Sequence, residues 1–373
     1  MPACGGPGDV GSGGEAEELE ELEMEAILGA GSPPRPTGPA PQRLGAAADD
    51  TEDAGRSQRV EEPRPDAGEY EVTLHHYWPS RNLFCCCGLF VTGGSNECWV
   101  PNLCVWSMIL GPCSLYFLWV FPSLVSHGAF ALPAATLVVF VITTGLLCLT
   151  CCTDPGIIPR REVVLATGTA AKLQQALGYD ILGGDAEEGM NVPAKLYQQG
   201  YRWCRTCRII RPPRASHCSD CDNCVLRYDH HCPFVNNCVG QRNYAYFLGF
   251  ISSVLVLCVL VIPSIFAFYS SINRERSVKG MATVSSSTRL LWYLLIAGGG
   301  IVIMAAFLSF LLAGYHGFLI ATNQTTKEFR RKIPNLTEEP TLFASRGPRL
   351  FDRWARVDVR DLHPGTRRTG RSL

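Results

Sequence analysis

Four long apolar stretches constrain this chain more than any other feature of its sequence. They lie near residues 100–126, 132–152, 244–269 and 290–321, and none of them contains Asp, Glu, Lys or Arg. A helix needs about 20 mostly apolar residues to cross the hydrocarbon core of a bilayer. Helices buried in a soluble bundle would be expected to show polar stripes at helical spacing. The sequence therefore predicts a mainly α-helical, polytopic membrane protein with four transmembrane helices.

An even number of spans places both chain termini and the segment 153–243 on one side of the membrane. That segment carries 11 Lys and Arg residues and the chain after residue 321 carries 12, against four in 270–289. Positively charged loops favour the cytosol, and clustered free thiols persist where glutathione keeps them reduced. We therefore expect 153–243 and both termini to be cytosolic, in a membrane of the Golgi, the endoplasmic reticulum or the cell surface.

The parts outside the spans differ in composition. Residues 1–69 contain no Phe, Trp or Tyr but 12 Gly, 9 Pro and an acidic run, which predicts a disordered tail. The expected segments are the tail 1–69, a juxtamembrane part with two spans at 70–152, a loop at 153–243 that is cysteine-rich from about 202 to 243, two spans at 244–321, and a tail at 322–373. The whole chain has 33 basic and 34 acidic residues. This balance argues against a strongly basic nucleic-acid binder, and no nucleic-acid partner is expected.

Seven cysteines and three histidines crowd into 35 residues of the cysteine-rich part. They are Cys204, Cys207, His217, Cys218, Cys221, Cys224, His230, His231, Cys232 and Cys238. Cys-x-x-Cys pairs let two thiolates reach one tetrahedral zinc ion. Two four-ligand sites would use eight of the ten side chains, but the spacing does not say which two are spare. A disulfide or redox cluster, the alternative, would leave the histidines unexplained.

Asp229-His230-His231-Cys232 resembles the signature of the DHHC family of membrane protein S-acyltransferases. The resemblance extends over about 225 residues and includes the four spans, Asp154-Pro155-Gly156 after the second span, and Thr325-Thr326-Lys327-Glu328 after the fourth. It implies two interleaved zinc sites. One would be formed by Cys204, Cys207, His217 and Cys224, and the other by Cys218, Cys221, His231 and Cys238. His230 and Cys232 would then be the spare pair.

A cysteine that is free of zinc can act as a nucleophile when a histidine lies beside it. The resemblance therefore implies that Cys232 is the nucleophile, His230 the general base and Asp229 the group that orients the imidazole. Cys232 would take a long-chain acyl group, palmitoyl above all, from acyl-CoA and pass it to a cysteine of a membrane-associated protein. Two structural zinc ions and acyl-CoA as co-substrate are the expected cofactors, and the lipid bilayer is the expected surroundings.

Other residues are assigned to binding and support. Three phenylalanines, Phe234, Phe247 and Phe250, could line the mouth of an acyl-chain cavity, although aromatic residues are also common at membrane interfaces. Lys327 and Arg330 could meet the CoA phosphates, or serve only as the positive flank of the last span. The resemblance implies that Asp154, Thr325, Thr326 and Glu328 brace the zinc domain against the spans.

The chain departs from the family at two places. Phe234 follows the Cys-Pro pair where many relatives have Trp, and the tail shows no clear Asn-Pro-aromatic segment. Leu350, Phe351, Trp354 and Val357 form a short apolar stripe that could be a helix on the membrane surface, a helix packed on the zinc domain, or a disordered segment. The arginines that flank it are Arg349, Arg353, Arg356 and Arg360. Six further cysteines near membrane ends, Cys85, Cys86, Cys87, Cys148, Cys151 and Cys152, could be S-acylated or could be small hydrophobic residues.

Two other classes of function compete with an acyltransferase. A membrane-anchored zinc module that recruits partners would have a similar cysteine density, but it would not need an unligated cysteine beside a histidine. A transporter or channel should carry ionisable groups in mid-membrane, and only His316, near the end of a span, approaches that description. An S-acyltransferase is therefore the predicted function.

Overall fold

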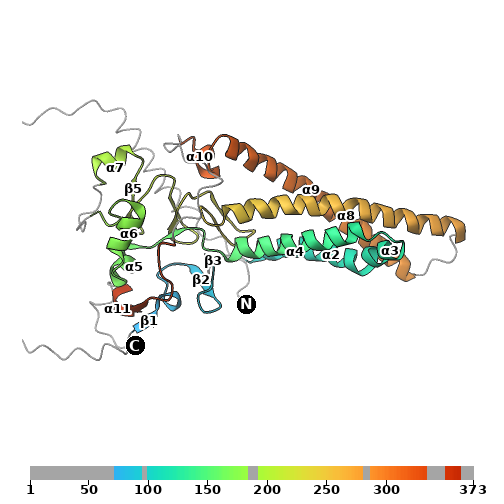
Figure 1. Ribbon diagram of the computed structural model, residues 1–373, viewed down its shortest axis with the longest axis horizontal. Coiled ribbons are helices and arrows are strands. Elements are labelled where there is room, and N and C mark those ends of the chain that lie inside the picture. The colour runs from blue at the N-terminus through green and yellow to red at the C-terminus, as the bar shows by residue number, and fades with distance from the viewer. Residues whose placement is uncertain (1–70, 95–98, 184–191, 280–285, 334–348, 363–373) are drawn as a thin grey trace, which may run out of the picture. The chain divides into compact units, whose positions relative to one another are not determined.

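The computed structural model describes residues 71–94, 99–183, 192–279, 286–333 and 349–362, all within the unit Tyr70–Leu373. The expected disordered tail at 1–69 lies outside these residues. Within the described residues, four helical stretches are long and apolar enough to cross a membrane: Val100–Ser126, Ala131–Cys152, Tyr244–Ser270 and Tyr293–Ala321 (Figure 1). The prediction of a mainly helical chain with four membrane helices is confirmed.

The first span is the least regular of the four. It consists of α2 (Val100–Leu115), a π-helical turn η2 (Tyr116–Val120) and α3 (Phe121–Ser126). Pro112 lies inside α2, where it removes a backbone donor and crowds the preceding turn. A helix can accommodate such an interruption with a wider turn. The π turn begins four residues after this proline.

The other three spans are unbroken helices that extend to or past the expected limits. They are α4 (Ala131–Cys152), α8 (Tyr244–Lys279) and α9 (Ser286–Ala321). Helix α8 packs against both α4 and α9, and α2 also contacts α9. A cluster of buried apolar side chains fills the interior, including Tyr116, Leu147, Phe247 and Val261.

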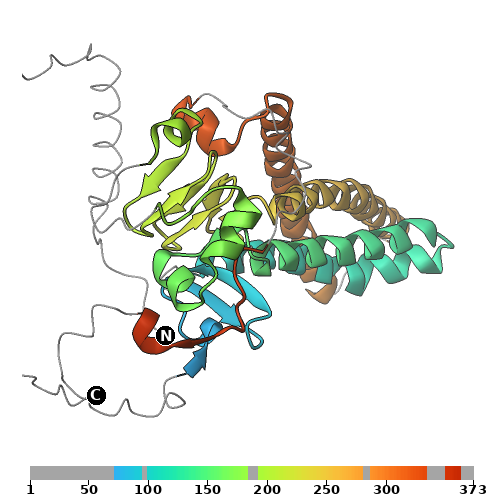
Figure 2. The same cartoon turned by 60° about the vertical axis from the view of Figure 1, so that its left-hand side comes forward.

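Short antiparallel hairpins carry the cysteine-rich part between α4 and α8 (Figure 2). The strands are β4 (Ile157–Ile158), β5 (Arg202–Cys204), β6 (Ile209–Arg211), β7 (Ser216–Cys218), β8 (Asn223–Val225), β9 (His230–Cys232) and β10 (Asn237–Val239). They pair as β5–β6, β9–β10 and the three-stranded order β4-β8-β7. Three short helices, α5 (Arg161–Ala166), α6 (Ala170–Leu177) and α7 (Ala194–Gln198), lie in the loop before β5. Strands this short need support beyond their own pairing.

The segment before the first span forms a hairpin of its own. Strand β2 (Asn82–Cys85) pairs with β3 (Phe90–Gly94), and β1 (Glu71–Thr73) with the turn η1 (Leu74–His76) precedes them. Helix α10 (Thr326–Arg331) follows the last span, and β11 (Arg356–Asp358) with α11 (Val359–Leu362) ends the described chain. Strand β11 pairs with β1, which joins the two ends of the described chain.

The C-terminal apolar stripe is not a helix on the membrane surface. Leu350 packs in the apolar cluster of the cysteine-rich part, and Phe351 and Val357 pack in a second cluster with Leu74. Only Trp354 of the four is largely exposed, at 47%. Three of the four stripe residues are buried against the rest of the unit, and the stripe leads into strand β11. It therefore packs against the protein, as the second alternative predicted, but it does not form a helix.

Candidate functional site

Strand β9 separates the two adjacent histidines. His230, His231 and Cys232 are its three residues, and His231 lies opposite Cys238 in β10. Successive side chains of a strand point to opposite faces, and directly opposed residues share a face. His231 therefore shares a face with Cys238, and His230 shares the other face with Cys232. The local fold thus divides metal-ligand candidates from catalytic candidates.

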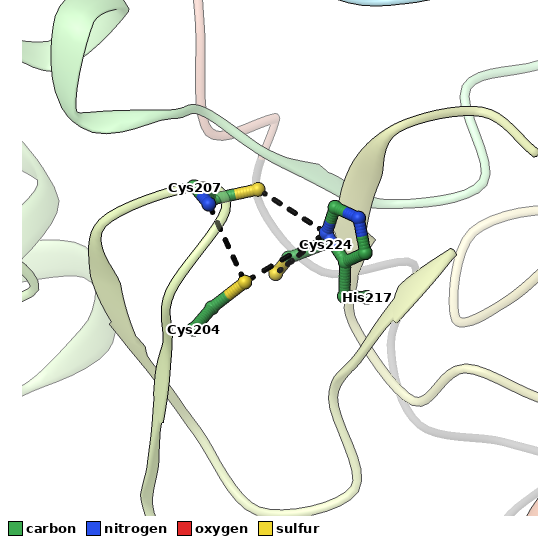
Figure 3. Close-up of side chains that lie close together, drawn as sticks. All are labelled: Cys204, Cys207, His217 and Cys224. Carbon is green, nitrogen blue, oxygen red and sulfur yellow. Dashed lines mark hydrogen bonds between the residues drawn. The ribbon is translucent and has the colours of Figure 1, made fainter. Parts of the chain in front are cut away.

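Two groups of four side chains could each hold a zinc ion. Figure 3 shows the first group, Cys204, Cys207, His217 and Cys224, and the second group is Cys218, Cys221, His231 and Cys238. In each group the ligand atoms all lie within 4.8 Å of one another. Their membership coincides with the two sets that the family resemblance implies.

The distances within both groups fit tetrahedral zinc. Zn–S bonds of about 2.3 Å and Zn–N bonds of about 2.0 Å imply sulfur-to-nitrogen separations of about 3.5 Å. In the first group, Nδ1 of His217 lies 3.4 Å from Cys207 Sγ and 3.7 Å from Cys204 Sγ. In the second group, Nδ1 of His231 lies 3.5 Å from Cys221 Sγ and 3.6 Å from Cys238 Sγ. The donor set and its spacing suit a closed structural site.

Cys232 belongs to neither group and has His230 as its polar neighbour. Nδ1 of His230 lies 2.6 Å from Oδ2 of Asp229, whose side chain is buried. Asp229 also accepts hydrogen bonds from the backbone N–H of Thr326 at 2.8 Å and from its hydroxyl at 2.7 Å. A buried carboxylate fixed in this way holds the imidazole in one orientation.

The charges around Cys232 favour its thiolate. Burial raises the pKa of the Cys232 thiol, but the hydrogen bond and charge of His230 and backbone N–H groups of the following loop lower it by more, so the net shift is downward. Burial lowers the pKa of His230, but its hydrogen bonds with Asp229 and Cys232 raise it to about 9. Each shift stabilises the charged form of its group at neutral pH. A thiolate beside an imidazolium is the activated form of a nucleophilic cysteine.

Asparagine side chains attach the catalytic hairpin to the ends of the spans. Asn237 donates to the carbonyls of Cys151 and Thr153, at 3.1 and 3.0 Å. Asn243 donates to the carbonyl of Thr150 at 3.3 Å. On the first span, Asn102 donates to the carbonyl of Phe234 at 2.9 Å. Cys232 is therefore held at the end of the helical bundle.

The residues expected to bind the acyl chain and CoA differ in their burial and contacts. Phe247 and Phe250 are buried in the same cluster as Cys232, and the Phe247 ring centroid lies 5.5 Å from that of His230. Phe234 is 55% exposed. Lys327 donates to the hydroxyl of Ser216, and Arg330 is exposed on α10. Two of the three phenylalanines thus belong to the apolar cluster that contains the thiol.

The four residues assigned to support make contacts at two places, the turn after α4 and the start of α10. Asp154 accepts from the backbone N–H groups of Gly156 and Ile157, both at 2.9 Å, and so closes the turn after α4. Thr325 and Glu328 form a reciprocal capping box at the start of α10. Thr326 contacts Asp229 directly, through the two hydrogen bonds given above.

Sequence reasoning missed two contacts at the site. Arg214 forms a buried, two-pronged ion pair with Glu328, at 2.8 and 2.9 Å. His316, considered only as a mark of a transporter, is 1% exposed and hydrogen-bonded through Nδ1 to the Tyr244 hydroxyl at 3.0 Å. Its ring centroid lies 6.2 Å from that of His230. For His316, the sequence signal that could have predicted the contact is a histidine in an otherwise uncharged span, which indicates a buried polar contact.

Comparison with known proteins identifies the family. A model described as DHHC palmitoyltransferase matches residues 197–333. The Arabidopsis thaliana "Probable protein S-acyltransferase 3" is 30% identical over 317 residues, covering 78% of this chain and 72% of that protein. The chain belongs to the DHHC palmitoyltransferase family.

Animal relatives match a similar part of the chain. "Palmitoyltransferase ZDHHC9" of Danio rerio is 35% identical over 257 residues, which cover 67% of this chain and 62% of the relative. The Homo sapiens protein of that name is 35% identical over 262 residues, which cover 67% of this chain and 66% of the relative. The chain thus spans slightly less than two thirds of the length of these two relatives.

Proposed function

We propose that this chain is a protein S-acyltransferase that carries a long-chain acyl group, palmitoyl above all, on Cys232. The observation that supports this most is the position of Cys232 outside both zinc groups, beside a histidine that a buried carboxylate orients. A zinc-bound thiolate is a poor nucleophile, whereas a thiolate paired with imidazolium is a good one. The chemistry of a recruiting zinc module would not require this arrangement.

The first half-reaction forms a thioester on the enzyme. The Cys232 thiolate attacks the carbonyl carbon of acyl-CoA, the new carbon–sulfur bond forms, and the bond to the CoA sulfur breaks. The His230 imidazolium gives its proton to the departing CoA thiolate. Asp229, held by Thr326, stabilises the imidazolium before this transfer and keeps the ring in place.

The second half-reaction returns the enzyme to its starting state. His230 takes the proton of a substrate cysteine, whose sulfur attacks the acyl carbon, and Cys232 leaves as a thiolate. One thioester replaces another in each step, so the exchange needs no ATP. The enzyme must mainly supply orientation and a thiolate.

The surroundings suit these reactants. Phe247 and Phe250 continue from Cys232 into the apolar interior of the bundle, which offers surroundings for an acyl chain. Lys327 and Arg330 lie on α10 directly after the last span, where they could meet the CoA phosphates. The acceptors would be cysteines of membrane-associated proteins. Segment 153–243 and both termini would be cytosolic, in the Golgi, the endoplasmic reticulum or the plasma membrane.

The two zinc ions would act on folding. Each would join two short hairpins, and His231 and Cys238 would fix the two strands on either side of the loop that follows Cys232. When bound, zinc supplies a structural crosslink between these strands. The acyl transfer itself would be performed by side chains outside the metal sites.

The test is to incubate the purified protein with labelled palmitoyl-CoA and to locate hydroxylamine-sensitive label by peptide mass spectrometry. Wild type should be labelled on Cys232, and Cys232→Ser should lose that label while keeping two zinc ions per chain. Cys204→Ser should instead lower the zinc content toward one ion. A zinc-loaded wild type without label, or a Cys232→Ser variant that loses a zinc ion, would contradict the proposal and favour the recruiting zinc module.

A further inference from the structure

Asn236, in the loop that follows Cys232, buries an amide group that forms no hydrogen bond with the rest of the protein. The residue is 2% exposed, and neither its Nδ2 nor its Oδ1 is hydrogen-bonded to a described residue. Within the described part of the chain, it is the one buried residue that leaves two side-chain polar atoms unpaired. A buried polar group that is left unpaired costs its whole desolvation free energy. The presence of this amide therefore needs a reason.

The backbone conformation of Asn236 does not supply that reason. Its φ of 48° lies in the left-handed region, where asparagine and glycine are the favoured residues. Glycine would adopt this conformation without burying a polar side chain. The neighbouring Asn237 shows what an anchoring amide does, because its Nδ2 donates to the carbonyls of Cys151 and Thr153. The Asn236 amide makes no such anchoring contact.

The loop keeps Asn236 close to the Cys232 thiol. Asn237 lies directly opposite Cys232 in the β9–β10 pair, and Asn236 is the residue before it. Opposed residues of an antiparallel pair have Cα atoms about 5 Å apart. The backbone N–H groups of Phe234 and Val235 face the thiol, where they favour its thiolate. The four-residue turn thus folds around the sulfur, and Asn236 is its last residue.

The proposed acyl transfer creates a negative charge to which the mechanism above assigns no donor. Attack of a thiolate on a thioester moves the carbonyl π electrons onto the oxygen, and preorganised hydrogen-bond donors at that oxygen are usually the largest single contribution to catalysis. Cys232 belongs to an apolar cluster, whose side chains cannot stabilise such a charge. His230 serves the sulfur atoms, because its proton passes to the departing CoA thiolate. A donor for the oxygen must come from another residue of the site.

We propose that the Nδ2 amino group of Asn236 donates a hydrogen bond to the acyl carbonyl oxygen and stabilises the oxyanion of the tetrahedral intermediate. The inference rests on the proposed function. As the bond from Cys232 sulfur to the acyl carbon forms, the π electron pair moves to the oxygen. When that pair returns, the bond to the CoA sulfur breaks and His230 protonates this sulfur. The amide of Asn236 transfers no proton in either step.

The unpaired state of the amide suits this role. Because neither of its polar atoms is hydrogen-bonded to a described residue, the group can turn to present its N–H without breaking a contact. The acyl oxygen then satisfies a donor that is otherwise buried at a cost. The second half-reaction passes through an intermediate with the same oxygen, so the same donor serves both steps.

Alkylation by iodoacetamide separates this role from a structural one. In that reaction the Cys232 sulfur displaces iodide from a saturated carbon, and no oxyanion forms. The rate of alkylation therefore depends on the thiolate and its accessibility, but not on a donor to oxygen. A residue that only shapes the loop would affect alkylation and acylation together.

The experiment uses the purified full-length protein and measures single-turnover formation of the Cys232 thioester with saturating labelled palmitoyl-CoA, beside alkylation by iodoacetamide. Asn236→Gly keeps the left-handed backbone and removes the amide. We expect acylation to slow about 10²-fold to 10³-fold, with alkylation and zinc content as in wild type. Asn236→Asp keeps the size and replaces the amino group with an oxygen, so its acylation should slow about 10²-fold more than its alkylation. Thr92→Val is the matched control, because it removes another buried unpaired group, in β3, and should keep both wild-type rates.

The outcomes distinguish this inference from the function on which it rests. A wild type that is alkylated but never acylated on Cys232 would refute the proposed function. A wild type that is acylated, with an Asn236→Gly variant that is acylated equally fast, would overturn the present inference alone. Equal slowing of acylation and alkylation in the Asn236 variants would also overturn it. If Asn236→Gly loses zinc, the ratio of the two rates in Asn236→Asp decides the question.

Discussion

The hydroxyl of Thr326 should matter for catalysis rather than for folding. It donates one of the hydrogen bonds that hold the Asp229 carboxylate, and the backbone N–H of the same residue donates another. Thr326→Val keeps the shape and the backbone donor and removes only the hydroxyl. A hydrogen bond to a charged group contributes about 1.5–3 kcal/mol. Because about 1.4 kcal/mol is a factor of ten, acyl-enzyme formation should slow by about 10-fold to 100-fold.

The assay is single-turnover formation of the Cys232 thioester with palmitoyl-CoA in excess. Thr326→Ser keeps the donor and should remain near the wild-type rate. Thr322→Val is the matched control, because the Thr322 hydroxyl donates only to carbonyls of α9. Zinc content should be two ions per chain in all variants. A Val variant at the wild-type rate, or a Ser variant as slow as the Val variant, would refute the idea that the hydroxyl orients the dyad.

Three further predictions concern the surroundings of the site. His230→Ala should slow acyl-enzyme formation about 10²-fold to 10⁴-fold at neutral pH. A pH–rate profile should show partial recovery as pH rises, since the imidazolium that lowers the thiol pKa is absent and hydroxide must form the thiolate. Arg214→Met leaves a buried carboxylate unpaired and should lower the free energy of unfolding by about 3–5 kcal/mol, whereas exposed Arg330→Met should not. Gly93→Ala would place Cβ 2.7 Å from a backbone oxygen of the catalytic loop and should slow thioester formation, while Gly111→Ala, with open space, should not.

Much of the fold could be predicted because the membrane imposes a simple rule on length and polarity. The four spans followed from uncharged apolar runs, and their helices begin and end close to the expected residues. The C-terminal stripe was harder, because an amphipathic stripe flanked by arginines suits a membrane surface and a protein interior equally well. The stripe packs in the protein interior because the Arg353 guanidinium is buried against backbone carbonyls of the β2–β3 hairpin. This partner is more than 260 residues away in the sequence. No local sequence pattern predicts a contact between residues so far apart.

The sequence, with the family resemblance, predicted which side chains form the two four-residue groups, but not how the fold brings them together. Counting ligands left two residues over, and only the family resemblance named them. The physical reason appears in β9, where alternation of side chains sends His231 toward Cys238 and leaves His230 beside Cys232. A three-residue strand cannot be recognised from a sequence dominated by ligand residues. The contact of Thr326 with Asp229 also joins residues 97 apart, so the sequence could not predict it.

The way in which the hairpin meets α4 explains how a zinc domain can be set at a fixed depth. The last carbonyls of any helix lack intrahelical partners, and near a bilayer an unsatisfied polar group is costly. Asn237 and Asn243 satisfy the carbonyls of Thr150, Cys151 and Thr153 at this helix end. The two parts of this contact therefore depend on each other: the hairpin that carries Cys232 caps the span, and the end of the span positions that hairpin. Asn237 adjoins Cys238 in β10, and Asn243 donates to the Cys238 carbonyl at 2.8 Å. If the second group binds zinc as we propose, we expect removal of the metal to loosen the helix end together with the loop that follows Cys232.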